Sequence, residues 1–259
     1  MLCIRAFYIG ADASALAVAG LKYGMPIILA IETSSELASC ALHGGAAAII
    51  SRESSGVRTH SQSVLPMVQA VLAEAGICLR DCDAIAFGAG PGSFTGVRTA
   101  CGIAQGLAYG AGLPVLALNT LAAMALACHQ QTGASCVLPL LDARMGEVYW
   151  AQYRFGEGGI QVLAEAALCA PEAVMPVAAP FIACGNGLAA YPLAFADQAF
   201  VAALPAIMPH AAQIAELAQV ELAAGRAVSA AQAQPLYLRN KIAFTSAERL
   251  VINAAKAAA

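Results

Sequence analysis

Hydrophobic residues near the start of the chain form short runs that are separated by turn residues. Residues 27–32 (IILAIE), 37–42 (LASCAL) and 46–51 each have the length and apolar content of a buried strand. A Thr-Ser-Ser turn at 33–35 separates the first two runs, and the glycine pair at 44–45 is typical of a hairpin turn. The pattern therefore predicts three consecutive strands before the first helix.

Helices and strands are predicted to alternate after these three strands. Apolar side chains recur at helical spacing from Ser61 to Ala75, and Gly76 ends that helix. The pattern then predicts a strand at 84–88, a helix from about 94 to 109, a strand at 114–118 and a helix from Thr120. This order favours an α/β fold of the actin-like ATPase (ribonuclease-H-like) type, because other doubly wound folds usually alternate from their first strand.

A second, smaller lobe is predicted after residue 131. Its strands are expected at 137–143, 147–153, 160–168 and 181–185, with a turn at 144–146 and a helix after the last strand. An amphipathic helix is expected at 210–224, with Glu216 and Glu221 on its solvent-facing side. The order repeats the first lobe in reduced form.

The chain is accordingly divided into four parts. We assign residues 1–25 to an N-terminal extension, 26–131 to the first lobe, 132–245 to the second lobe with the C-terminal segment, and 246–259 to an alanine-rich tail. The extension has an apolar patch, but Asp12 and Ser14 interrupt it, so it does not resemble a clean secretory signal. We expect either that Met25 is the natural start or that the extension is a poorly packed appendage.

Composition and charge narrow the class of function. The chain is 60% hydrophobic and 11% charged, which allows a large core. The formal net charge is −3 and no dense Lys/Arg run occurs, which argues against an autonomous nucleic-acid binder. Residues 99–141 carry no Asp, Glu, Lys or Arg, but several glycines and Pro114 interrupt the run. Buried α/β elements explain this run better than a membrane span does.

Cysteines and histidines give no metal-binding pattern. Nine cysteines are scattered without a CxxC pair, which fits reduced, buried thiols in a cytoplasmic protein. None of the four histidines lies four residues from another. We therefore expect no metal site.

Residues 90–98, GPGSFTGVR, have the composition of a phosphate-facing loop. Glycines allow close backbone approach, Ser93 can cap the next helix, and a helix N-terminus can bind an anion. An ordinary tight turn between strand and helix would use the same residues, and the stretch is not a Walker motif. Arg98 suits either a phosphate or a carboxylate of a partner protein, and both alternatives stay open.

Three glycines are spaced by four residues in the helix that follows. Gly102, Gly106 and Gly110 therefore share one helix face. Each interior glycine costs about 1 kcal/mol relative to alanine, so close packing must compensate. The glycines could pack on the chain's own sheet or receive a helix of a partner, and the sequence leaves both open.

Six segments together resemble the TsaB family, over about residues 26–243. They are LAIETSSELASCAL, THSQSVLPMV, GPGSFTGVR, GIAQGLA, LDARMGEVYWAQY and YLRNKIA. The resemblance implies an actin-like fold shared with the paralogue TsaD, and a non-catalytic subunit that supports TsaD. TsaD would transfer threonylcarbamoyl to N6 of adenosine 37 in tRNAs that read ANN codons. The resemblance also implies a TsaE-like ATPase as second partner, indirect contact with tRNA, and no cofactor beyond a nucleotide at an interface with partners.

The resemblance also directs attention to individual positions. Where TsaD-like proteins carry a His-x-x-x-His pair, this sequence has Thr120 and Met124, which do not suit a catalytic metal. Glu32 and Asp142 stand where actin-like ATPases keep carboxylates for magnesium-nucleotide, although both could simply accept hydrogen bonds from their turns. The candidate vestigial nucleotide or phosphate site comprises Glu32, Ser93, Arg98 and Asp142.

We expect the partner interface on the helices at 61–76 and 94–110, which could also pair two copies of the chain when no partner is present. The candidate interface residues are Leu65, Val68, Leu72, Gly102, Gly106 and Tyr109. The alternative function is an active nucleotide- or metal-dependent enzyme of the same fold, such as an ATPase or a glycoprotease-like peptidase. That alternative predicts metal or ATP binding by the isolated chain.

Overall fold

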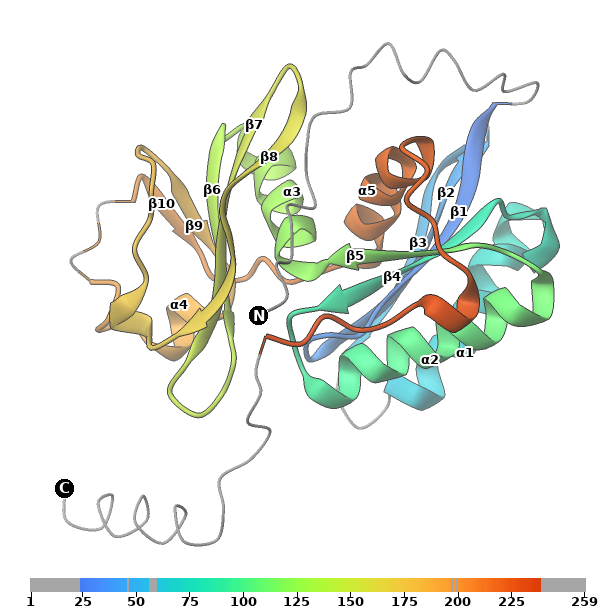
Figure 1. Cartoon of the computed structure of the whole chain (residues 1–259), viewed down its shortest axis with the longest axis horizontal. Helices are drawn as coiled ribbons and strands as arrows, with labels where there is room; N and C mark the ends of the chain where they lie inside the picture. Colours follow the sequence, from blue (N-terminus) through green and yellow to red (C-terminus); the bar gives the residue numbers. More distant parts are fainter. Residues whose placement is uncertain (1–23, 46, 56–59, 197, 199, 239–259) are drawn as a thin grey trace, which may run out of the picture.

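The computed structural model describes residues 24–45, 47–55, 60–196, 198 and 200–238. Two five-stranded mixed sheets stand apart from each other, and two helices lie between them (Figure 1). The predictions made for the N-terminal extension and for the alanine-rich tail fall almost wholly outside the described residues.

The first sheet has the strand order β3-β2-β1-β4-β5. Its strands are β1 (Met25–Glu32), β2 (Leu37–Gly45), β3 (Ala47–Ser55), β4 (Ala84–Gly90) and β5 (Val115–Asn119). β1 pairs antiparallel with β2, where Glu32 lies opposite Ser39, and parallel with β4, where Ile31 lies opposite Phe87. β1 is thus the central strand of this sheet. Its side chains enter two different cores, one on each face of the sheet, which explains its continuous run of apolar residues.

The second sheet has the order β10-β9-β6-β7-β8. Its strands are β6 (Cys136–Asp142), β7 (Val148–Gly156), β8 (Gly159–Cys169), β9 (Ile182–Cys184) and β10 (Ala202–Leu204). β6 pairs antiparallel with β7 and parallel with β9, as β1 pairs with β2 and β4. The second sheet therefore repeats the first strand by strand, and the predicted two-lobed actin-like fold is confirmed.

Helices cover the outer face of the first sheet and fill the space between the sheets (Figure 1). On the outer face lie α1 (His60–Ala75) and α2 (Phe94–Ala111), side by side. Between the sheets lie α3 (Thr120–Thr132), which packs on β6, and α5 (Ala211–Ala223), which packs on β1 and β2. The helix that follows the strands of one lobe thus packs on the sheet of the other lobe: α3 follows β5 but packs on the second sheet, and α5 follows β10 but packs on the first. The division of the chain after residue 131 stays a prediction.

The second lobe is reduced at the helices that would match α1 and α2. Among the residues that the structure describes, its outer side has only the short helix α4 (Gly187–Ala190) and the 3-10 turn η4 (Pro171–Ala173). α4 ends before Tyr191 because Pro192 follows, and a residue before proline is disfavoured in helical conformation. Two further 3-10 turns, η3 (Leu79–Asp81) and η5 (Ala230–Gln232), belong to the first lobe's outer face.

One sequence prediction is corrected in this fold, and one strand had not been predicted. Glu221 was expected on the solvent side of α5, but it is 7% exposed. Arg226, which follows the helix, pairs with its carboxylate and compensates the charge. β10 was not predicted at all, because three residues give no detectable period.

The uncharged run at 99–141 is divided among α2, β5, α3 and β6, as expected for buried α/β elements. Across the described residues, no helix has both the length and the apolar content needed to cross a membrane. The eight cysteines in the described part of the chain are free thiols, and seven of them are at least partly buried.

Candidate functional site

α2 presents two chemically different faces. Ala100, Ala104 and Ala108 are buried against the sheet, whereas the face with Gly102 and Gly106 is exposed. A Cβ built on Gly102, Gly106 or Gly110 would have no heavy atom within 4 Å outside the helix's own backbone. The glycines therefore do not serve packing on the chain's own sheet, since the alanines fill that role. Of the two alternatives left open by the sequence, this geometry favours a face that receives a partner.

Large apolar side chains accompany the glycines on the outer face. Leu65 on α1 is 45% exposed and Tyr109 on α2 is 86% exposed, although burial of apolar surface is favourable. Leu72 is half-buried. Val68, in contrast, is only 4% exposed and packs in the core beneath α1, so this one predicted interface residue is corrected. The outer face of α1 and α2, defined by Leu65, Leu72, Gly102, Gly106, Gly110 and Tyr109, is called the helical face below.

An open hollow adjoins the helical face at the C-terminal half of α2. It has a volume of about 350 Å³ and is lined by Cys78, Leu79, Arg80, Gly106, Leu107, Gly110 and Ala111. Because Gly106 and Gly110 have no side chain beyond hydrogen, this space stays open. An apolar side chain of a partner could enter it.

The loop before α2 is fixed by the chain itself. Ser93 caps the helix, because its Oγ accepts from the Gly96 N–H at 3.3 Å, and its own N–H donates to the Ser34 carbonyl at 2.7 Å. A Cβ on Gly92 would lie 2.5 Å from the Ser34 carbonyl oxygen, and one on Gly96 would lie 1.9 Å from that of Thr33. The glycines thus allow the loop to approach the β1–β2 turn, which favours the ordinary-turn interpretation over a phosphate loop.

Glu32 and Asp142 occupy matching positions at the ends of β1 and β6, and they hold their turns in the same way. Glu32 Oε1 accepts from the Ser34 N–H at 2.5 Å, and Asp142 Oδ1 accepts from the Arg144 N–H at 2.8 Å. This matches the alternative in which the two carboxylates satisfy turn N–H groups.

The Glu32 carboxyl is nevertheless unusual, because it is fully buried. Its Oε2 atom makes no hydrogen bond of normal geometry, nor do the neighbouring hydroxyls of Ser34 and Thr120. Burial raises the pKa of Glu32 above its ordinary value, and the nearby polar groups of Ser34, Thr33 and Thr120 oppose that rise. A Cβ on Gly88 would lie 1.7 Å from Oε2, so β4 needs glycine at this position.

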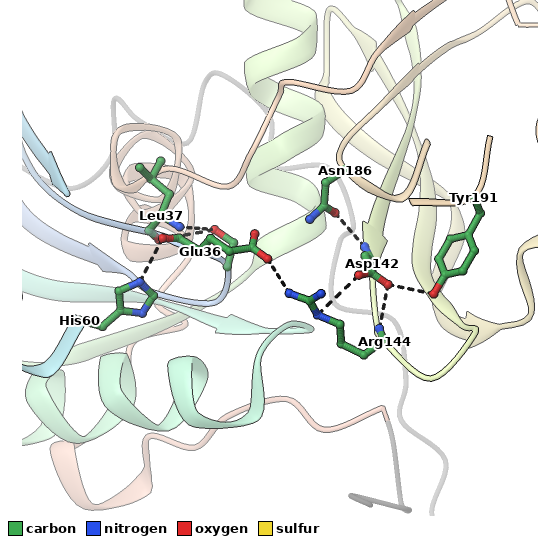
Figure 2. A network of polar contacts seen from close by, with 8 residues as sticks. Glu36, Leu37, His60, Asp142, Arg144, Asn186 and Tyr191 are labelled. Carbon is green, nitrogen blue, oxygen red and sulfur yellow. Dashed lines mark hydrogen bonds and ion pairs between the residues drawn. The ribbon is translucent and has the colours of Figure 1, made fainter. Parts of the chain in front are cut away.

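Asp142 lies in a network that links the two lobes, and Figure 2 shows it. Its backbone N–H donates to Asn186 Oδ1 at 2.8 Å, and the Tyr191 hydroxyl donates to its Oδ1 at 3.0 Å. The pKa of Tyr191 is raised, mainly by burial and to a smaller extent by the contact with Asp142. Arg144 lies 3.5 Å from Asp142 Oδ2 and donates to Glu36 in the first lobe at 2.8 Å. This inter-lobe ion pair was not predicted, because Arg144 and Glu36 are far apart in the chain.

Thr120 and Met124, which the resemblance places at the positions of the TsaD-like histidine pair, are both fully buried in α3. A Cβ on Gly185 would lie 2.5 Å from Met124 Cε, so this side chain is part of the core between the lobes. Within the described ranges, no three His, Cys, Asp or Glu side chains gather in a way that could hold a metal ion.

Arg98 does not join Glu32 and Asp142, because it makes a separate contact with the C-terminal segment. Its Nε donates to the Tyr237 hydroxyl at 2.7 Å, and its guanidinium carbon lies 3.6 Å from the centroid of the Phe94 ring. Tyr237 was not among the predicted site residues. The only available signal was that the segment YLRNKIA belongs to the resemblance.

Comparison with known proteins gives matches over most of the chain. The family model described as TsaD, tRNA N6-adenosine threonylcarbamoyltransferase, matches residues 47–255. The chain is 40% identical over 223 residues to the tRNA threonylcarbamoyladenosine biosynthesis protein TsaB of Escherichia coli, which covers 84% of this chain and 96% of that protein. It is also 40% identical over 229 residues to the Haemophilus influenzae protein of the same name, covering 84% and 95%. Among solved structures, YeaZ from Pseudomonas aeruginosa matches with a TM-score of 0.78 and 40% identity, over 83% of this chain and 100% of that one.

Proposed function

The chain belongs to the TsaB family of tRNA threonylcarbamoyladenosine biosynthesis proteins, and from this membership we propose that it acts as the non-catalytic partner subunit of a TsaD-like protein. In this role the TsaD-like subunit transfers threonylcarbamoyl to N6 of adenosine 37 in tRNA. The chain binds and supports that subunit, together with a TsaE-like ATPase.

The observation that carries the proposal is the open glycine face of α2. Three helix-interior glycines face solvent with no neighbour within 4 Å, although each costs the isolated chain about 1 kcal/mol relative to alanine. A partner helix that approaches these glycines closely would recover this cost by packing. The exposed Leu65 and Tyr109 enlarge the apolar part of the same surface. A stable contact buries about 1,600 Å² in total, which the two helices with the adjoining hollow could supply.

Two other observations support an indirect role in tRNA modification. The formal net charge of −3 is unfavourable for gripping a phosphate backbone directly. The Glu32 carboxyl is buried and accepts from its own turn, so it is not presented to a magnesium-nucleotide. Contact with tRNA therefore runs through the complex.

The proposal is tested by isothermal titration calorimetry with the TsaD-like protein of the same cell. We expect saturable binding by the wild-type chain. Gly106→Leu should weaken that binding at least about 100-fold, because four added carbon atoms prevent close approach of the partner. Gly158→Leu is the matched control, since Gly158 is also exposed with open space around it but lies on the second lobe.

The outcomes separate the proposal from the enzyme alternative. Absence of binding by the wild-type chain would refute the partner role, and unchanged binding by Gly106→Leu would refute the helical face. Titration of the isolated chain with magnesium-ATP provides the remaining arm. Stoichiometric nucleotide binding together with turnover would favour the active-enzyme alternative.

A further inference from the structure

Arg98 lies in line with the exposed glycines. Arg98, Gly102, Gly106 and Gly110 are spaced by four residues, so they follow one side of α2. Arg98 is the one charged residue in the sequence of this helix, and it is exposed near its N-terminal end. The glycine face therefore has one cation from its own helix, at the N-terminal end, while Arg80 of η3 lines the hollow near the other end.

The Arg98 side chain is held by aromatic neighbours. Its guanidinium carbon lies 3.6 Å from the Phe94 ring centroid and 5.5 Å from the Tyr237 ring centroid. Its Nε donates to the Tyr237 hydroxyl at 2.7 Å. These contacts fix the guanidinium before any partner arrives, which reduces the conformational entropy that binding would cost.

Tyr237 is itself fixed, because the segment before it is bound to the first lobe. The Leu236 N–H donates to the Ala89 carbonyl at 2.7 Å, at the end of β4. The Gln105 side chain of α2 donates to the Ala233 carbonyl at 2.9 Å. Tyr237 is therefore a stable support for Arg98 rather than a chance neighbour.

The charge of Arg98 has no carboxylate partner among the described residues. The arginine–carboxylate pairs there involve Arg52, Arg144 and Arg226. The one hydrogen bond recorded for Arg98 uses Nε, which leaves both Nη groups as donors. If a partner covers α2, an unpaired guanidinium would lose its water without compensation, and that is strongly unfavourable.

We propose that Arg98, positioned by Phe94 and Tyr237, is a recognition site for a carboxylate side chain of the protein that covers the helical face. The inference rests on the proposed function, in which that protein is the TsaD-like subunit. The two Nη groups bind the carboxylate at the end of the interface, while the glycines receive the apolar part of the partner's helix. Arginine beside aromatic residues is a common hot spot of protein interfaces.

A partner carboxylate fits this site better than an RNA phosphate. Glu74 is the other charged side chain on the two helices, and it pairs with Arg52. Phosphate backbones are gripped by several cations together, and Arg98 has none beside it on these helices. A single fixed guanidinium bordered by apolar surface is instead typical of protein–protein contacts.

The test compares three variants by calorimetric titration with the TsaD-like protein, at low and at high salt. Arg98→Met should weaken binding at least about 30-fold at low salt, and by a smaller factor at high salt, because ions screen the charge pair. Arg98→Lys should fall between Arg98→Met and wild type, since it keeps the charge but loses the planar fork. Arg154→Met removes one exposed arginine from the second lobe and should leave affinity unchanged.

A fourth variant and a second ligand complete the test. Tyr237→Phe keeps the ring but removes the hydroxyl that holds Nε, and it should weaken binding several-fold. If wild type and Arg98→Met bind equally, the inference is overturned while the partner role stands. If wild type does not bind, the proposed function fails with it. Unchanged affinity for the TsaD-like protein, with weaker tRNA binding by the assembled complex, would identify a phosphate contact and overturn the carboxylate.

Discussion

Replacing the three exposed glycines of α2 by alanine should stabilise the isolated chain and weaken its complex. Each Gly→Ala change in a helix interior contributes about 1 kcal/mol. No neighbour lies within 4 Å of the new Cβ atoms, so no clash offsets the gain. Gly110 lies close to the helix end at Ala111, where propensity counts less, so the triple variant should gain about 2–3 kcal/mol. For a chain of this size the melting temperature should rise by roughly 5–10 °C.

The same variant should bind the TsaD-like protein less tightly. Each methyl group would occupy space that a closely packed partner backbone needs, and overpacking typically costs about 1–3 kcal/mol. Urea unfolding measures the first effect and calorimetric titration the second, with Gly158→Ala as control for both. No gain in stability would mean that the glycines already pack against something. A gain with unchanged affinity would show that the glycine face lies outside the interface.

Two further predictions concern Glu32 and the two sides of α1. Burial raises the pKa of Glu32 above its ordinary 4.5, so the stability linked to its proton is present below that pH and is lost as the pH rises through the folded-state pKa. The free energy of unfolding of Glu32→Gln, relative to that of wild type, should therefore increase between pH 4 and pH 8 when both are measured by urea unfolding. A difference that does not change with pH would contradict the raised pKa. Val68→Ala should destabilise the chain by about 2 kcal/mol while Leu65→Ala changes stability little and partner affinity more. If Val68→Ala and Leu65→Ala lowered the free energy of unfolding equally, the assignment of Val68 to the core and Leu65 to the exposed side of α1 would be contradicted.

Much of the fold was predictable because local patterns and global structure agree. The apolar spacing of residues 61–75 predicted α1 to within a residue, and α2 (Phe94–Ala111) agrees closely with the helix predicted from about 94 to 109. The pattern could not separate Leu65 from Val68, because both belong to the same apolar stripe. Which part of that stripe faces the sheet depends on how the helix is rotated in the fold, and periodicity does not record this.

The contacts that join distant parts of the chain were not predictable. Arg98 and Tyr237 are 139 residues apart, and Arg144 and Glu36 are 108 apart. Periodicity and local motifs in a single sequence do not indicate which distant residues come into contact. The exchange of inner helices between the lobes was missed for the same reason, since α3 follows β5 in sequence but packs on the second sheet.

The partner-binding role of the helical face can be tested most directly by hydrogen–deuterium exchange with and without the TsaD-like protein. Protection should rise at residues 60–75 and 94–111, where the partner would exclude water, and at 236–238 beside Arg98. The strands of the second sheet should exchange as in the free chain. Protection confined to the second lobe, or none in the presence of saturating partner, would contradict this role.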